Sequence, residues 1–314
     1  MDLIRWLVNL ILIALILLLG IFGFKFMCMY YPEKMQAFSI VNPSPNLPSV
    51  ENISNEFSLF YPNLRFNHKD ITFFINEECS SQQKDKLIEA FLIITNYTEI
   101  IKFYPSSEEN ADILIGCSKN SYEAEESVFI AGEGGPTKII NSTYFPIIEK
   151  GKILLYNQKT CEKPITELHE LIHVLGFEHV NNTKSIMYPY LSCEQEVDSE
   201  IINMLKELYS IEPKAELYFL NASAVKFGKY VNFSVNVRNE GLISAQNIIL
   251  KVISENIQLD SFDLREIEFG AGKTFEVSYL NVPSKANSLI FKLETETPEF
   301  DKDNNILSSN FQEV

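Results

Sequence analysis

The pattern of hydrophobic and polar positions divides the chain into four stretches of different character. An unbroken apolar run comes first, and a proline-rich polar stretch without a sustained period follows it. Strand-like and helix-like periods then alternate, and the last part contains only short strand-like runs. The pattern predicts a transmembrane segment in residues 1–30, a linker or stalk in 31–56, a mixed α/β domain in 57–211 and an all-β domain in 212–314.

The first apolar run is LIRWLVNLILIALILLLGIFGF, residues 3–24, which is interrupted only by Arg5 and Asn9. Its length matches the ~20 residues that cross a bilayer as a helix. A cleaved signal peptide is the alternative, but its apolar region is usually ~7–15 residues long and ends in a small-x-small site. The run is longer and is followed by no such site, so the pattern favours an uncleaved anchor. Flanking positive charges are nearly balanced and do not set its orientation.

The α/β domain is predicted from the change of period along residues 57–211. Strand-like runs occupy 71–76, 99–104, 111–117, 127–131 and 152–157, and the sequence GEGGP at 132–136 suits a turn or a close backbone approach. Helical spacing of apolar residues predicts helices at 81–97 and 198–210. We therefore expect an α+β domain of α/β type, with a twisted mixed sheet packed on helices.

The all-β domain is predicted from short alternating runs separated by Gly, Asn and Pro. About seven short strands in about 100 residues are typical of an antiparallel, immunoglobulin-like sandwich. The clearest runs are 215–223, 230–241, 247–254, 274–282 and 288–296.

Charge and cysteine usage limit the partners and the compartment. The formal net charge of −16 repels phosphate backbones and argues against nucleic acid as a partner. Four cysteines without C-x-x-C spacing indicate two disulfides in an oxidising compartment, and four cysteines allow three pairings. Several N-x-[ST] sequons also favour a body that faces outward. The cysteines concerned are Cys79, Cys117, Cys161 and Cys193.

The sequence HELIHVLGFEH, residues 169–179, holds three of the four histidines in the chain. In a helix, His169 and His173 lie one turn apart on the same face and could bind one metal ion. Glu170 is offset and could reach a water on that metal. Gly176 suits the left-handed turn that ends a helix, and this turn would bring His179 back to the same point.

Three neutral imidazoles and one open position describe a catalytic zinc site, whereas a structural site is closed by four ligands. A closed site would need a further ligand such as Tyr190 or a distal carboxylate, and nothing in the spacing indicates one. A helix with surface histidines is the other alternative. It is disfavoured because the pattern fixes five positions in a chain poor in histidine.

The motif H-E-x-x-H-x-x-G-x-x-H, followed by SIMYPY at residues 185–190, resembles the metzincin zinc peptidases. The resemblance covers roughly residues 57–210. It implies that Met187 forms a hydrophobic base under the zinc ligands. Tyr188, Pro189 and Tyr190 look like the matrixin form of this methionine turn.

Three departures from matrixins stand out. Val180 occupies a position where matrixins usually have Ser or Thr. Only His68 remains for a second, structural zinc, so we expect that site to be absent. No cysteine-switch motif surrounds Cys28, so we expect no latch of that kind.

The resemblance also implies a mechanism and a disulfide pattern. Zinc would lower the pKa of its water toward ~7, and Glu170 would take the proton and return it to the leaving amine. The edge strand that holds an extended substrate would be residues 127–135, although this segment also suits an ordinary edge strand. A Cys161–Cys193 bond would join the active-site helix to the methionine turn, which leaves Cys79–Cys117 as the second bond.

The all-β domain resembles the CARDB type of immunoglobulin-like domain. The resemblance rests on FSVNVRNEG (233–241), FGAGKTFEVSY (269–279) and ETPEFDKDNN (296–305), and it implies adhesion, spacing or presentation of a surface partner. The segment DKDNN offers oxygen atoms of the kind that calcium prefers. We expect a solvated acidic loop there in preference to a calcium site.

These patterns together predict a membrane-anchored, extracellular zinc endopeptidase that takes one catalytic zinc ion and a peptide or protein substrate. The alternative from another class is a surface adhesion or binding protein with a catalytically silent domain. Silent relatives commonly lack the general base or a metal ligand. Glu170 and all three histidines are present here, which favours the enzyme.

Overall fold

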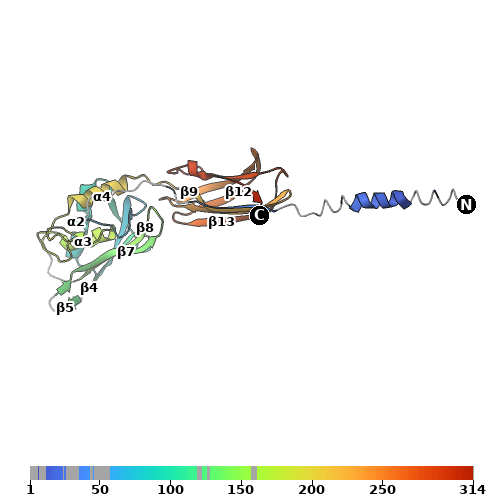
Figure 1. The fold of residues 1–314 in the computed structure, drawn as a ribbon. Coiled ribbons are helices and arrows are strands. Elements are labelled where there is room, and N and C mark those ends of the chain that lie inside the picture. The colour runs from blue at the N-terminus through green and yellow to red at the C-terminus, as the bar shows by residue number, and fades with distance from the viewer. Residues whose placement is uncertain are drawn as a thin grey trace.

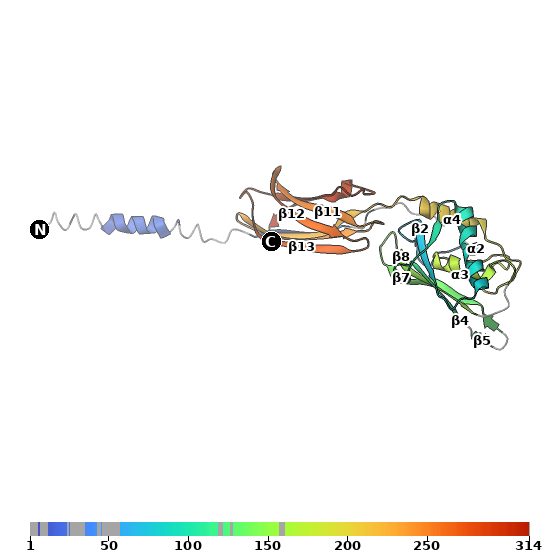
Figure 2. The same ribbon diagram turned by 180° about the vertical axis from the view of Figure 1, so that it is seen from behind.

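The computed structural model describes residues 6, 12–23, 25, 35–42, 45, 57–118, 122–125, 128–156 and 161–313. Figure 1 shows an α/β domain next to a β-sandwich, and Figure 2 shows the same two bodies from behind. The order of a predicted α+β domain followed by an all-β region is therefore confirmed.

The α/β domain is built on a five-stranded mixed sheet in the order β3-β2-β4-β8-β7. The first four strands are parallel, and β7 runs antiparallel to β8 at the edge. Buried and less buried residues alternate along β4, as expected for a strand whose alternate side chains enter a core. The strands are β2 (Asp70–Ile75), β3 (Lys102–Pro105), β4 (Ile113–Ser118), β7 (Gly132–Ile140) and β8 (Ile147–Tyr156).

Three helices share one hydrophobic core with this sheet. A capping box between Ser80 and Gln83 begins the first of them, and Leu87, Phe91 and Ile94 of that helix are buried at helical spacing. A Cys79–Cys117 disulfide ties the residues before this helix to β4. The helices are α2 (Ser81–Thr98), α3 (Ile165–Val174) and α4 (Ser199–Ser210).

The β-sandwich consists of a five-stranded sheet, β13-β10-β9-β1-β16, and a four-stranded sheet, β12-β11-β14-β15. Along β10, Val231, Phe233, Val235 and Val237 point into the core, as the alternating sequence predicts. The strands of the C-terminal region are β9 (Leu217–Phe227), β10 (Tyr230–Asn239), β11 (Ala245–Ser254), β12 (Ile257–Ile267), β13 (Gly272–Asn281), β14 (Ser288–Glu294), β15 (Ile306–Asn310) and β16 (Gln312–Glu313), with a 3₁₀ turn at Asp303–Asn305.

Strand β1 (Gln36–Val41) lies inside the stretch predicted to be a linker, and here the structure differs from the prediction. The strand pairs with β9 from Gln36↔Lys226 to Val41↔Asn221, and two of its apolar side chains, Phe38 and Ile40, pack on the sandwich core. Two inward residues give too short a period to distinguish a strand from a linker. The α/β domain is thus inserted in the chain between two neighbouring strands of one sheet.

The two bodies meet at a close-packed junction. Phe145, Ile147 and Leu242 are fully buried there. The carboxylate of Glu240, only 1% exposed, accepts hydrogen bonds from Ser142 Oγ at 2.6 Å and from the Thr143 backbone N–H at 2.7 Å. Because the turn between β7 and β8 supplies the partners of Glu240, the sandwich is fixed to the edge of the α/β sheet.

Part of the predicted anchor is described, and its residues 12–23 are helical. Within the described part of the chain, no helix has both the length and the apolar character needed to span a bilayer. The rest of the predicted anchor lies outside the described residues, so the anchor remains a prediction.

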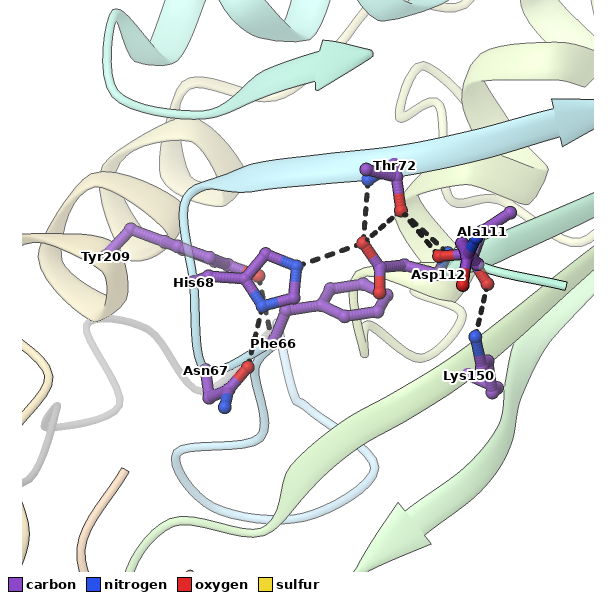
Figure 3. Close-up of polar contacts among 9 residues, drawn as sticks. Phe66, Asn67, His68, Thr72, Ala111, Asp112, Lys150 and Tyr209 are labelled. Carbon is purple, nitrogen blue, oxygen red and sulfur yellow. Dashed lines mark hydrogen bonds and ion pairs between the residues drawn. The ribbon is translucent and has the colours of Figure 1, made fainter. Parts of the chain in front are cut away.

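The remaining histidine, His68, belongs to a polar cluster beside β2 (Figure 3). Its Nε2 lies 3.0 Å from Asp112 Oδ2, which also accepts hydrogen bonds from the backbone N–H and the hydroxyl of Thr72, each at 2.7 Å. Burial raises the pKa of Asp112, but the hydrogen bonds from His68 and Thr72 outweigh it and hold this pKa below its ordinary value. The cluster joins the segment before β2 to the start of β4.

We predict that Asp112→Asn lowers the free energy of unfolding at neutral pH by on the order of 1 kcal/mol, because charge-assisted hydrogen bonds are lost. A carboxylate with a depressed folded-state pKa stabilises the protein above about pH 4 and loses this effect as the pH falls. The acid-induced loss of stability should therefore be smaller in the variant than in the native chain. Urea unfolding at several pH values measures both effects, with the exposed Asp70→Asn as control.

Candidate active site

Helix α3 supplies two of the three clustered histidines. It begins at Ile165 after Pro164, and Leu168, Leu171 and Ile172 hold it against the core. His169 and His173 lie one turn apart on it and are both buried. The Cys161–Cys193 disulfide joins the segment before α3 to the residues after the methionine turn, so both predicted disulfides are present.

A turn at Gly176 brings in the third histidine. This glycine has φ +104, which side chains rarely tolerate, and a Cβ atom there would lie 3.1 Å from the Leu64 side chain. Its N–H donates to the carbonyl oxygen of His173 at 2.9 Å, just past the end of α3. The chain then reverses and places His179 beside the two helical histidines.

The three Nε2 atoms converge on one point. They are 3.1 Å apart for His169 and His173, 3.2 Å for His169 and His179, and 3.0 Å for His173 and His179. The Nδ1 atom of each histidine on α3 contacts a backbone carbonyl oxygen on the side away from this point. The Nδ1 of His169 lies 2.6 Å from the oxygen of Ile186, and the Nδ1 of His173 lies 2.8 Å from the oxygen of Phe177. Since a carbonyl can only accept, Nδ1 carries the proton and the Nε2 lone pair faces the centre of the cluster.

This donor set fits a zinc ion. A tetrahedral zinc with bonds of ~2.0–2.1 Å to imidazole separates its nitrogen ligands by about 3.3 Å, close to the spacing found here. Burial, followed by the neighbouring histidines, lowers the pKa of His169 to about 4; for His173, burial is again the main cause of a pKa of about 4. Burial also lowers the pKa of His179, so all three imidazoles are neutral near pH 7, as metal ligands must be.

The methionine turn packs directly behind this cluster. Met187 is fully buried, and its carbonyl oxygen accepts a hydrogen bond from the N–H of Val180 at 3.0 Å. Ser185 Oγ accepts from the N–H of Met187 and donates to Asp198 at 2.6 Å, which ties the turn to the start of α4. The turn therefore holds His169 through the carbonyl of Ile186.

The last three residues of the methionine turn lie at or near the surface. The rings of Tyr188 and Tyr190 lie 5.8 Å apart between their centroids; Tyr188 is half-buried, and Tyr190 and Pro189 are exposed. They form a surface next to the cluster.

Glu170 is buried between α3 and the edge strand β7. A Cβ atom at Gly132 would lie 2.8 Å from its Oε1, and one at Gly134 would lie 2.4 Å from its backbone oxygen, so only glycines allow this approach. Burial, then the charges of Glu133 and Glu167, raise the pKa of Glu170 to about 8. A divalent cation on the histidines would oppose this shift, because positive charge favours the carboxylate.

The edge strand differs from the segment predicted for it, residues 127–135. The strand that borders the sheet is β7, residues 132–140, whereas β6 (Val128–Ile130) pairs with β5 (Tyr122–Glu125) in a separate ribbon. The alternation in SVFIA indicated a strand correctly but could not say which sheet it joins. The glycines of GEGG form the part of β7 that contacts α3, so the predicted close backbone approach is present, whereas a turn at 132–136 is wrong because the segment is a strand.

Sequence reasoning missed Phe60, whose ring stacks on His173 with centroids 6.1 Å apart. The Phe60 N–H donates to the carbonyl oxygen of Gly176 at 2.8 Å, and Ser58 donates to Glu178 at 2.9 Å. The start of the domain therefore covers the turn that carries His179. No pattern in the sequence around Phe60 signals this role.

Comparison with known families agrees with this geometry. Residues 65–210 match the model of the matrixin family. This match supports a matrixin-like metallopeptidase domain, and the matched residues include the three histidines and Glu170. No curated protein matches the chain. The match ends before the sandwich, so the resemblance to CARDB remains a prediction.

We predict that Gly134→Ala pushes β7 away from α3, at a cost of about 1–3 kcal/mol for overpacking. Gly135→Ala is the matched control, because a Cβ atom there has no neighbour within 4 Å. Thermal unfolding of both variants measures the difference. Equal melting temperatures would contradict the described contact between β7 and Glu170.

We also predict that His173→Ala loses most of its zinc, because two imidazoles remain where three converge. The expected loss of affinity is at least tenfold, measured by zinc titration against a competing chelator. The His68→Ala variant serves as control and should keep full zinc affinity. Native affinity in His173→Ala would remove this residue from the ligand set.

Proposed function

We propose that the protein is a zinc endopeptidase, anchored in a membrane by its N-terminal apolar run and facing outward. The observation that carries the proposal is the convergence of three neutral imidazoles next to a buried glutamate and a sheet edge. The matrixin match supports the class of reaction, and the apolar run and the two disulfides support the location.

The three histidines His169, His173 and His179 would hold the ion. Within the described part of the chain, this metal-competent group contains no fourth His, Cys, Asp or Glu, which supports an open coordination position. When bound there, zinc supplies Lewis acidity to a substrate carbonyl and lowers the pKa of water. The Nδ1 bonds to Ile186 and Phe177 keep both helical rings oriented for this task.

Glu170 would move the proton in this scheme. Its carboxylate follows His169 directly, is enclosed by α3 and β7, and is suited to accept a proton from the attacking water. The same carboxyl group would then give this proton to the leaving amine. Burial excludes bulk water around Glu170 and strengthens its electrostatic interaction with a nearby cation.

The edge strand β7 would position the substrate. Among the described residues, no strand neighbours its outer side in the sheet order, so its backbone groups would be open to an extended peptide. Because Gly132 and Gly134 place this strand against Glu170, a peptide bound along β7 would pass close to the general base.

A catalytically silent adhesion protein is the second candidate. It would explain the presence of a sandwich domain, but it gives no reason to retain Glu170 and the complete histidine set. The methionine turn is also intact, with Met187 fully buried. These features favour the enzyme.

We predict that Glu170→Gln cuts a diverse peptide library ~10²–10⁴-fold more slowly than the native chain, because the general base is lost. Mass spectrometry of the products measures the rate and shows the cleavage sites. Glu207→Gln, at an exposed position of α4, is the control and should retain activity. Native turnover in Glu170→Gln with zinc bound would contradict the proposed mechanism.

A further inference from the structure

Three aromatic rings, two of them exposed, form a cluster at one end of the sandwich. Tyr279 lies 5.7 Å from Phe227 and 6.2 Å from Tyr230, measured between ring centroids, and Lys229 Nζ lies 5.4 Å from the Tyr230 ring centre. Tyr279 is 68% exposed and Tyr230 is 36% exposed. Core packing does not explain why large aromatic rings cluster at a solvent-exposed position.

The backbone of Tyr279 adds a second, independent observation. It has φ +60 beside a bulge where the register between β10 and β13 shifts, and its N–H donates to Asn232 Oδ1 at 2.7 Å. A bulky residue at positive φ is a rare and strained conformation, and such strain is concentrated at functional sites. The strain here presents a ring to solvent, which suggests a contact made by that ring.

The cluster belongs to the end of the sandwich that lies away from the α/β domain (Figure 1). The β9–β10 turn is tied to the β13–β14 loop by Lys226 Nζ, which donates to the carbonyls of Ser284 and Ala286. That loop contacts the β11–β12 turn through the Asn287 N–H and Glu255. We call this end the apolar pole; its exposed large side chains are Met35, Tyr230, Ile257 and Tyr279.

The path of the chain indicates which surface the apolar pole faces. Strand β1 begins there, because Gln36 pairs with Lys226 next to the aromatic cluster. Only the residues between Phe24 and Gln36 connect the pole to the apolar run at 3–24, and a fully extended chain of this length spans roughly 40 Å at most. If that run spans a bilayer, the pole therefore lies within this distance of the membrane surface.

We propose that the apolar pole rests in the headgroup region of the membrane that holds the N-terminal anchor. The inference rests on the anchoring part of the proposed function. Tyrosine suits this region because its ring is apolar and its hydroxyl stays in water. Lys229 and Lys285, both exposed at the pole, would face lipid phosphates, although the chain as a whole carries a net charge of −16.

This contact would fix the direction in which the peptidase domain points. The metallopeptidase domain is attached to the opposite end of the sandwich, through the junction around Glu240 and Leu242. Two attachments, the anchor and the apolar pole, would hold the sandwich upright. The active site would then reach substrates in solution or on an opposing surface, away from the lipid.

The test uses the full chain in vesicles of phosphatidylcholine and phosphatidylglycerol whose acyl chains carry bromine near the headgroup. A bimane fluorophore is attached at Lys229→Cys, which leaves the three rings in place, with Cys28→Ser preventing labelling elsewhere. The control fluorophore is at Glu296→Cys, exposed near the opposite end of the sandwich. Flotation of the same vesicles reports anchoring, and peptide cleavage reports catalysis.

We expect the lipid bromines to quench the fluorophore at position 229 at least about threefold more than the one at position 296, because an interfacial contact lies within ~5–10 Å of the acyl boundary. Adding Tyr230→Ser and Tyr279→Ser should reduce quenching at 229 to the control level, with an unchanged melting temperature. Equal quenching at both positions in floating vesicles would overturn the contact but leave the anchor, and the pole would then suit a polysaccharide or a second copy of the chain. Chain that does not float would overturn both, whatever its peptidase activity.

Discussion

The convergence of three neutral imidazoles is the constraint on which the rest of the α/β domain depends. Lone pairs that point at one place repel one another, so the chain must hold the rings firmly, and a cation between them would relieve the repulsion. Helix α3 holds two rings, the positive-φ turn at Gly176 returns the third, and the carbonyls of Ile186 and Phe177 set the orientation of the two rings on α3. The Cys161–Cys193 disulfide, the methionine turn and α4 all support the segment that carries the histidines.

A second constraint comes from how the chain is threaded. Because β1 enters the sandwich before the α/β domain begins, the chain passes through the sandwich once before it builds the α/β domain and then returns to it (Figure 2). The buried carboxylate of Glu240 fixes the sandwich to the β7–β8 turn. The strand proposed to bind substrate is thus attached at one end to Glu170 and at the other to the sandwich.

The sequence predicted most of what local patterns can encode. The spacing of hydrophobic residues predicted α2, α4 and most strands, because side-chain burial repeats with the geometry of each element. Motif spacing located His169, His173 and His179, since a helical turn places two of them together and glycine reverses the chain. The disulfides followed from the family resemblance. Long-range relationships were missed: β1 in the sandwich, β7 as the sheet edge and Phe60 on His173 all depend on partners distant in the sequence.

The central claim is that the three histidines form an open metal centre, and zinc-edge X-ray absorption on the zinc-loaded chain tests it most directly. The account predicts one zinc per chain, bound by three imidazole nitrogens and one further light atom that exchanges with added ligand, such as a hydroxamate. A spectrum that shows a sulfur ligand, or a fourth protein ligand that no added hydroxamate displaces, would contradict it. The site would then be a closed structural centre.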